Sequence, residues 1–324
     1  GDSGDTTNIV GTLQNNGSEL VGDISSVVAG TGLSGGGTSG AVTLNSDLLA
    51  KQAGTNFSNS LLVGTSSTGT LSSAEGNTGV GIGVFGALTS GDNNVAVGLN
   101  ALDVNTTGSE NVAVGMGALD TNTTGAGNIS IGCGSMSANV SGNYNVAIGR
   151  CALDTSVSGS ANVAIGDRAL YTNTASYNTS VGFFSLAANT TGETNVAVGQ
   201  NSLAANTTGA RNTGIGQNAL LVNTTGANNT AVGQGALEAN TTASDNSAFG
   251  HDSLVANTTG VQNSAYGYRS LAANTTASNN TAVGNDTLDA NTTGAGNTAV
   301  GKAALSSNTT AGDNVAMGVN ALLS

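Results

Sequence analysis

The stretch Asn229-Thr-Ala-Val-Gly-Gln-Gly-Ala-Leu-Glu-Ala-Asn-Thr-Thr-Ala-Ser-Asp245 is one copy of a 17-residue unit that fills most of the chain. Fifteen copies begin between Asn77 and Asn314, and we count the leading asparagine of each as position 1. Residues at the same position of successive copies form a column. Every spacing is 17 residues except the 16 between Asn162 and Asn178. Such a period predicts a solenoid, whose turns are stable only when stacked on neighbours.

Several columns are nearly uniform. Column 5 is Gly in all fifteen copies, which indicates a positive φ or a close backbone approach. Column 4 is apolar throughout and column 9 is Leu in thirteen copies, so we expect these two columns to form the core. Column 3 is Ala, Gly or Ser, which would let a neighbouring surface pack closely on that face.

The spacing of the apolar residues favours strands over helices. An amphipathic helix needs apolar residues at i, i+3, i+4 and i+7, whereas each unit offers two anchors five residues apart with a glycine between them. The sequence therefore predicts an all-β fold, a parallel β-solenoid or β-roll, whose coils stack at about 4.8 Å into a rod of about 70 Å. Asparagines in columns 1 and 12 would pair their amides from turn to turn. The residue missing after Asn173 predicts a loop on that side of the turn.

The thin core predicts association of chains. Each large apolar side chain contributes about 1.5–3 kcal/mol on burial, while ordering the backbone costs about 1–2 kcal/mol per residue. Column 3 and the Val/Thr column beside it could supply a second apolar surface, so we expect parallel chains around one axis, most simply a homotrimer. Residues 77–324 would form the solenoid, with the last copy truncated, and residues 1–76 a β-rich stalk or joint.

Composition excludes several classes of function. The 324 residues include 50 Gly, no Pro and no Trp, with 8% charged residues and a net charge of -13. So few charges argue against a disordered chain. The six basic residues are scattered, so no nucleic-acid partner is expected. No apolar run approaches the roughly 18 residues of a membrane span, so no membrane insertion is expected.

The strand motifs Asn-Val-Ala-Val-Gly (94–98) and Asn-Val-Ala-Ile-Gly (145–149) resemble the head repeats of trimeric autotransporter adhesins. Those repeats form a left-handed parallel β-roll and trimerise, but they are typically shorter than the unit found here. The longer unit with Asn-Thr-Thr-Gly, and a Gly-rich segment within residues 24–46, are similar to parts of bacteriophage tail fibres. The resemblance covers residues 24–46 and 77–324.

The resemblance implies a non-enzymatic structural fibre without a cofactor, located in a virion tail or outside a cell. In this interpretation the chain is a tail-fibre shaft that spaces or presents a tip for binding a host receptor or glycan, and its other partner is itself. The alternative is a bacterial surface adhesin or a self-assembling extracellular filament. A third class, an ice-binding solenoid, would need Thr-x-Thr spacing, whereas these threonines are adjacent.

Motifs for catalysis or cofactor binding are weak. Two G-x-G-x-x-G matches, at 30–35 and 81–86, precede no helix that could hold a pyrophosphate. The single histidine, His251, is expected to be a solvated side chain next to Asp252. Asp103 and Asp120 share column 10 in adjacent copies and are a candidate cation pair, with catalysis by paired carboxylates a further reading. We predict no catalytic residues.

Two further features leave alternatives open. Asn-Thr-Thr is formally a glycosylation acceptor, although a structural asparagine ladder is the favoured reading. The acceptor asparagines are Asn105, Asn122, Asn189, Asn206, Asn223, Asn240, Asn257, Asn274, Asn291 and Asn308. Cys133 and Cys151 lie 18 residues apart, one turn plus one residue, so a bond within one chain is doubtful on strand geometry, and cross-chain pairing is the alternative.

Overall fold

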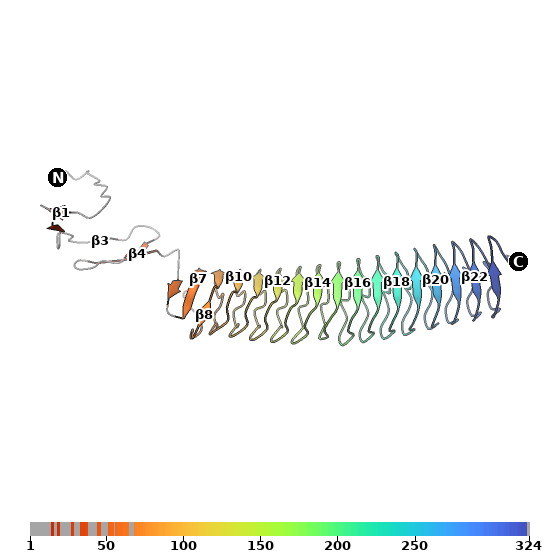
Figure 1. Cartoon of the computed structure of the whole chain (residues 1–324), viewed down its shortest axis with the longest axis horizontal. Helices are drawn as coiled ribbons and strands as arrows, with labels where there is room; N and C mark the ends of the chain where they lie inside the picture. Colours follow the sequence, from red (N-terminus) through yellow and green to blue (C-terminus); the bar gives the residue numbers. More distant parts are fainter. Residues whose placement is uncertain are drawn as a thin grey trace. The chain divides into compact units, whose positions relative to one another are not determined.

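Fifteen three-residue strands, one from each copy, stack in parallel along the repeat region of the computed structural model. The structure describes residues 56–64 and 68–322, and before them the backbone of short strands. In Figure 1 the stacked strands form one wall of the coil and all point the same way. The repeat region is therefore an all-β parallel solenoid of about 15 turns, as the sequence predicts.

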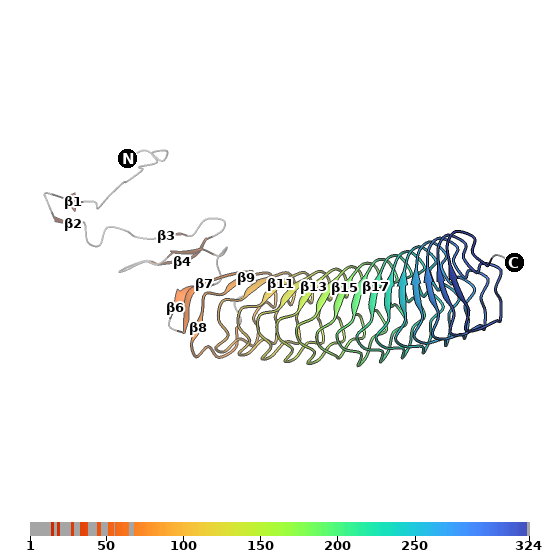
Figure 2. The same ribbon diagram turned by 45° about the vertical axis from the view of Figure 1, so that its right-hand side comes forward.

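The strands of the stack are β9 (Thr78–Val80), β10 (Val95–Val97), β11 (Val112–Val114), β12 (Ile129–Ile131), β13 (Val146–Ile148), β14 (Val163–Ile165), β15 (Thr179–Val181), β16 (Val196–Val198), β17 (Thr213–Ile215), β18 (Thr230–Val232), β19 (Ser247–Phe249), β20 (Ser264–Tyr266), β21 (Thr281–Val283), β22 (Thr298–Val300) and β23 (Val315–Met317). We name each turn after its strand. Strands pair in register, for example Ala96 with Ala113, so every column stacks on itself (Figure 2).

The stack begins before Asn77. Strand β7 (Phe57–Val63) pairs in parallel with β9, placing Leu61 beside Thr78, and it also pairs with β8 (Ala74–Glu75). The chain divides into two compact units, 1–51 and 52–324, so this boundary lies upstream of the expected one at residue 76.

Strand β6 (Lys51–Gly54) neighbours β7 in the sheet of the stack. The strands outside the stack are short, and they are β1 (Gln14–Asn15), β2 (Ser18–Glu19), β3 (Val27–Val28), β4 (Leu33–Gly37) and β5 (Leu44–Ser46). Strand β1 pairs antiparallel with β2, and β3, β4 and β5 form an antiparallel sheet. The G-x-G-x-x-G match at 30–35 lies partly outside the described residues.

Glycine is required in column 5 for two reasons. Gly98 has φ 134°, a conformation that L-residues rarely adopt. A Cβ built on Gly98 would also lie 2.7 Å from the carbonyl carbon of Gly115 in the next turn. Column 9 is left-handed as well, with Leu102 at φ 51°. The Leu102 side chain is fully buried, and the free energy of that burial offsets the strain of the left-handed backbone.

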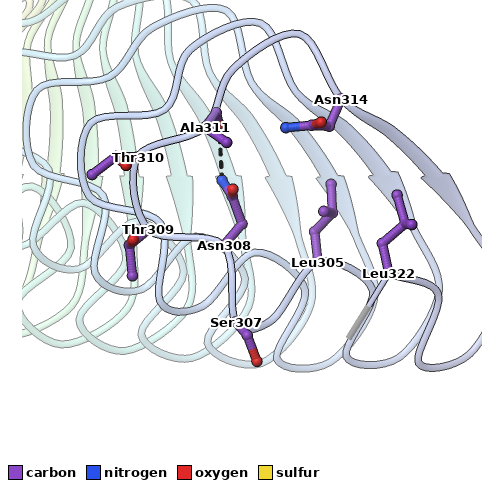
Figure 3. Close-up of a pocket in the computed structure, with 8 residues that line it drawn as sticks. All are labelled: Leu305, Ser307, Asn308, Thr309, Thr310, Ala311, Asn314 and Leu322. Atoms are coloured by element: carbon purple, nitrogen blue, oxygen red, sulfur yellow. Dashed lines mark hydrogen bonds between the residues drawn. The ribbon is translucent and has the colours of Figure 1, made fainter. Parts of the chain in front are cut away.

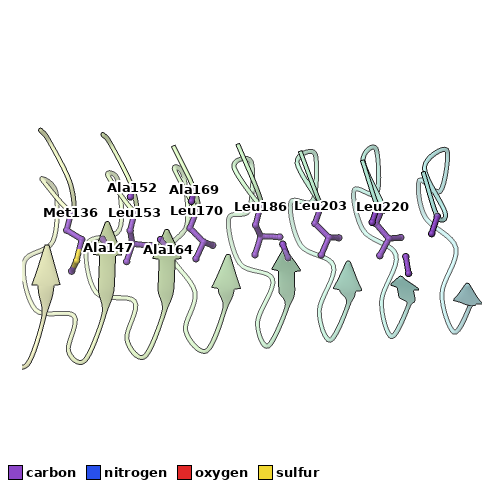
Figure 4. Close-up of a cluster of buried hydrophobic side chains, with 14 of the residues drawn as sticks. Met136, Ala147, Ala152, Leu153, Ala164, Ala169, Leu170, Leu186, Leu203 and Leu220 are labelled. Atoms are coloured by element: carbon purple, nitrogen blue, oxygen red, sulfur yellow. The ribbon is translucent and has the colours of Figure 1, made fainter. Parts of the chain in front are cut away.

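The core differs from the prediction in one column. Column 9 is buried, as expected, and its leucines stand in a row through the coil (Figure 4). The strand residues that face the leucines, however, are the small residues of column 3, such as Ala147 and Ala164. The small residues of column 8, just before each leucine, are buried there too. Column 4 points outward and is half-exposed; Ile215 is 39% exposed. The expectation that column 4 forms the core was therefore wrong, because alternate residues of a strand face opposite sides.

Asparagine ladders line the interior in columns 1 and 12. The side-chain oxygen of Asn212 accepts the backbone N–H of Asn229 at 3.0 Å and its amide N–H at 3.2 Å. The same Asn229 amide donates to the carbonyl of Ala243 at 2.8 Å, which ties two sides of the coil together. Most of these asparagines thus satisfy groups in their own turn and in the neighbouring turn, as a stack of identical amides can. The Asn280 amide nitrogen is an exception, since it is buried without a partner.

The column 12 ladder is weakest at the β13 and β14 turns. Ser156 replaces asparagine there, and its buried hydroxyl has no hydrogen-bond partner. In the 16-residue β14 turn, Asn173 donates to the carbonyl of Ala175, two residues on instead of three. The missing residue therefore falls in the loop that follows column 12, as the sequence predicts.

Candidate functional site

The outward side chains of columns 2 and 4 form a continuous surface, which we call the strand face. It runs along all fifteen strands, β9 to β23, and none of its residues is charged. The charged residues of 77–324 instead fall in columns 6, 7, 10, 16 and 17. The strand face measures about 70 Å by about 10 Å, so its area is on the order of 700 Å². Column 4 is apolar throughout, whereas column 2 is Thr or Ser in eight of the fifteen copies, so the face is uncharged but only partly apolar. Large apolar surfaces of this kind often mark sites of protein association.

Aromatic side chains replace the aliphatic residues of column 4 at β19 and β20. Phe249 and Tyr266 stack with ring centroids 5.0 Å apart and planes 6° apart. Beside them in column 6, His251 and Tyr268 stack at 5.5 Å. These rings extend further from the coil than the aliphatic residues of column 4 in other turns, so the two turns mark one place along an otherwise uniform face.

His251 lies on the surface beside Asp252, as expected. His251 Nδ1 lies 3.1 Å from Asp252 Oδ2, and both side chains are partly exposed. The adjacent Ser253 is buried and its hydroxyl donates to the carbonyl of Ala265 inside the coil. The three residues therefore do not converge on one reacting atom, as a catalytic triad must.

The acidic column brings together Asp103 and Asp120 in adjacent turns. Burial, with smaller effects from Asp103 and Asp154, raises the pKa of Asp120. Its Oδ1 is buried without a hydrogen-bond partner. Within residues 56–64 and 68–322, no group of three or more His, Cys, Asp or Glu side chains could hold a metal ion. Two stacked carboxylates supply fewer oxygens than the six to eight that a calcium ion takes.

A cavity of about 350 Å³ lies over the last complete turn (Figure 3). Its lining consists of Leu305, Ser307, Asn308, Thr309, Thr310, Ala311, Asn314 and Leu322. The Asn308 amide donates to the carbonyl of Ala311 at 3.0 Å. These are the columns that face the next turn elsewhere in the rod, and none of the lining side chains can exchange a proton near neutral pH.

The Asn-Thr-Thr asparagines lie inside the coil. The Asn122 amide donates to Asn105 Oδ1 at 2.8 Å and to the Gly125 carbonyl at 3.0 Å. Nine of the ten candidate glycosylation asparagines are fully buried, and Asn308, in the last complete turn, is partly buried. A glycan on the amide nitrogen would displace both hydrogen bonds. The structure therefore supports the ladder interpretation and disfavours glycosylation of the folded rod.

The two threonines of each turn face different environments. Thr106 Oγ1 donates to the carbonyl of Thr123 in the next turn at 2.9 Å, whereas Thr107 is exposed. The exposed threonines thus form a single row. Paired threonines on one face, which an ice-binding surface would need, are not formed by this motif.

The strand face was anticipated in part from the sequence, since the Val/Thr column 2 was expected to contribute to a surface for partner chains, whereas column 4 was assigned to the core. The absence of charge in columns 2 and 4 can be seen in the sequence, but a buried column gives the same signal.

Comparison with known proteins found no matching family model, no matching curated protein and no matching solved structure. Among the described residues no helix is long and apolar enough to cross a membrane.

Proposed function

We propose that this protein is a non-enzymatic structural fibre in which parallel chains, most simply three, turn their strand faces toward a common axis. The observation that carries this proposal is the charge-free strand face along the whole stack, in a chain with a net charge of -13. Burying it would remove half-exposed side chains such as Val97 and Ile165 from water. Its area, on the order of 700 Å², approaches the roughly 800 Å² that each partner of a standard interface buries.

The partner surface proposed from the sequence changes accordingly. Columns 3 and 2 were expected to meet neighbouring chains, but column 3 lies inside its own coil. In the proposed assembly column 2 keeps that role and column 4 joins it. All carboxylates of residues 77–324 lie in other columns, so an interface formed by columns 2 and 4 contains none of them. Buried apolar area contributes about 25 cal/mol per Å², which is offset in part by the entropy lost on association.

As a shaft, the rod would space or present a tip that binds a host receptor or glycan on a phage tail. The rigid in-register stack supports a spacing role, because each turn is fixed to the next by backbone and asparagine hydrogen bonds. A bacterial adhesin or extracellular filament would use the same rod. Immunogold electron microscopy separates the two, since the label falls on virion tails in the first case and on cell envelopes in the second.

The assembly is tested by light scattering on the full chain. We expect about three times the chain mass of 31.1 kDa. Val112→Asp, Val163→Asp and Val196→Asp together should give a single-chain mass with an unchanged β circular dichroism spectrum, because charges would enter the axis. The matched control carries Thr107→Asp, Thr208→Asp and Thr225→Asp on the exposed threonine row. A wild-type mass of one chain would overturn the proposal.

A further inference from the structure

The two cysteines of the chain lie side by side in adjacent turns. Cys133 is in column 6 of the β12 turn, and Cys151 is in column 7 of the β13 turn. The backbone N–H of Cys151 donates to the carbonyl oxygen of Cys133 at 3.0 Å. The sequence separation of 18 residues made a bond doubtful, but stacking with a one-residue offset brings these two backbones into direct contact.

The Cys151 side chain points toward the preceding turn. Cys151 has φ 53°, and a Cβ built on Gly134 would lie 3.6 Å from its Sγ atom. Gly134 follows Cys133 directly in the chain. Other column 7 side chains approach the glycine of the preceding turn in the same way, as Asp252 does at Gly235. The Cys151 thiol is therefore held next to the turn that carries Cys133.

The backbone geometry suits a disulfide. Disulfides join Cα atoms roughly 4.4–6.8 Å apart, and the direct backbone hydrogen bond from Cys151 to Cys133 holds the two residues next to each other. Both thiols are free, Cys133 is exposed and Cys151 is half-buried. Because Cys133 is exposed, its side chain is free to rotate about χ1 toward the Cys151 thiol.

We propose that Cys133 and Cys151 are an oxidation site that closes into a disulfide between the β12 and β13 turns. A small-molecule disulfide such as oxidised glutathione supplies the oxidant. The Cys133 thiolate attacks one of its sulfurs, forms a mixed disulfide and releases one glutathione thiolate. The Cys151 thiolate then attacks the Cys133 sulfur and releases the second glutathione. The cysteine pair loses two protons and two electrons, and one glutathione disulfide becomes two reduced glutathiones.

The order of the steps follows from exposure. Cys133 is the thiol that a reagent in solution reaches first. Burial, with a smaller effect from Asp154, raises the pKa of the Cys151 thiol, so it is less reactive until the mixed disulfide forms beside it.

The position of the bond has a structural consequence. It would join the β12 turn to the β13 turn, where the column 12 ladder is weak because Ser156 lacks a partner, and the next turn, β14, is one residue short. On the same side of the rod, Arg150 and Asp167 link the β13 and β14 turns at 2.9 Å. The disulfide would extend this line of side-chain links by one turn.

The test uses the full chain, reduced and then incubated with oxidised glutathione. Free thiols are alkylated, the protein is denatured, and it is digested with trypsin. Because trypsin cleaves after Arg150, the two cysteines fall in different peptides, 52–150 and 151–168. We expect these peptides to be joined, lighter by two hydrogen atoms than their sum, and separated by reductant. Hydrogen exchange in the β12 to β14 turns of the wild-type chain should slow severalfold on oxidation. The same treatment should not change hydrogen exchange in the Cys133→Ser or Cys151→Ser variant.

Three results would overturn the proposal. These are alkylated thiols on both cysteines, glutathione that stays on Cys133 without transfer, and a two-chain species on a non-reducing gel that is linked through Cys133. The serine variants must keep the wild-type circular dichroism spectrum, so that loss of the linked peptide reports on the bond and not on folding. The inference concerns one chain and does not depend on the proposed fibre or its trimer.

Discussion

The inside and the outside of each strand reverse the usual distribution of polar and apolar groups. Inside, carboxamides such as Asn229 are fully buried beside alanine and leucine. Outside, the strand face is uncharged and carries apolar side chains in column 4, with valine, isoleucine, threonine or serine in column 2. The difference teaches how a thin coil is stabilised. Its interior holds too few apolar atoms, so amides that donate and accept between turns supply the specificity, and the remaining apolar surface is left for another chain.

The largest expected effect tests how closely turns approach. Gly233→Ala in column 5 should cost more than about 3 kcal/mol, because φ is 138° and the new Cβ would lie 2.6 Å from the Gly250 carbonyl carbon. Gly235→Ala in the same turn is the control, since Ala303 already occupies that column at φ 53° and the new Cβ would meet the movable Asp252 carboxylate in place of backbone. Urea unfolding followed by circular dichroism measures both. Equal midpoints would refute the steric argument.

Next in size is removal of one buried amide. Asn229→Ala deletes the acceptor of the Asn246 backbone N–H, now at 3.1 Å, and leaves that group buried without a partner. We expect a loss of about 3 kcal/mol and faster hydrogen exchange in the β17 to β19 turns. Thr242→Ala, on the exposed threonine row of the same turn, should change little. If both variants exchange alike, the asparagine ladder is not what stabilises the stack.

A pair of valine substitutions compares the two sides of one strand directly. Ala231→Val adds volume inside the coil and should cost about 1–3 kcal/mol through overpacking. Thr230→Val lies on the strand face, where other turns already have valine, and should stay within about 0.5 kcal/mol. Thermal unfolding measures the pair. A larger loss of stability in Thr230→Val than in Ala231→Val would contradict the assignment of column 3 to the core.

Repair of the weak ladder should stabilise the rod. In Ser156→Asn, the new amide would continue the column 12 stack from Asn139, where the wild-type hydroxyl has no partner. We expect the free energy of unfolding to rise by about 1 kcal/mol. Ser158→Asn, two residues on and exposed, is the matched control. Hydrogen exchange of the β13 and β14 turns is the measurement, and no added protection would contradict the prediction.

The smallest effect belongs to the outer acidic column. Burial raises the folded-state pKa of Asp120 above its unfolded value, so its ionised form disfavours folding at neutral pH. Below the unfolded pKa the carboxyl is protonated in both states and this cost disappears. Asp120→Asn should therefore be slightly more stable than wild type at neutral pH and equal to it in acid. A difference that is independent of pH would rule out the carboxylate as its source.

Much of the fold could be predicted from the sequence because stacked identical turns make each column report on one environment. The glycine of column 5, the leucine of column 9 and the two asparagine columns were assigned correctly on this basis. Column 4 was not, because Val-Ala-Val offers apolar residues to both sides of the strand. Periodicity of two shows which residues share a side but not which side is inside.

By itself, the sequence determined the period, the in-register parallel stack, the need for glycine and the amide ladders, since these follow from repetition and local backbone conformation. The tertiary structure decided the rest. It placed alanine against the leucine row and valine outward, because the narrow coil has room for a methyl group opposite each leucine and not for two branched side chains. It also brought Cys133 and Cys151 together, through an offset between turns that a count of residues along the chain does not reveal.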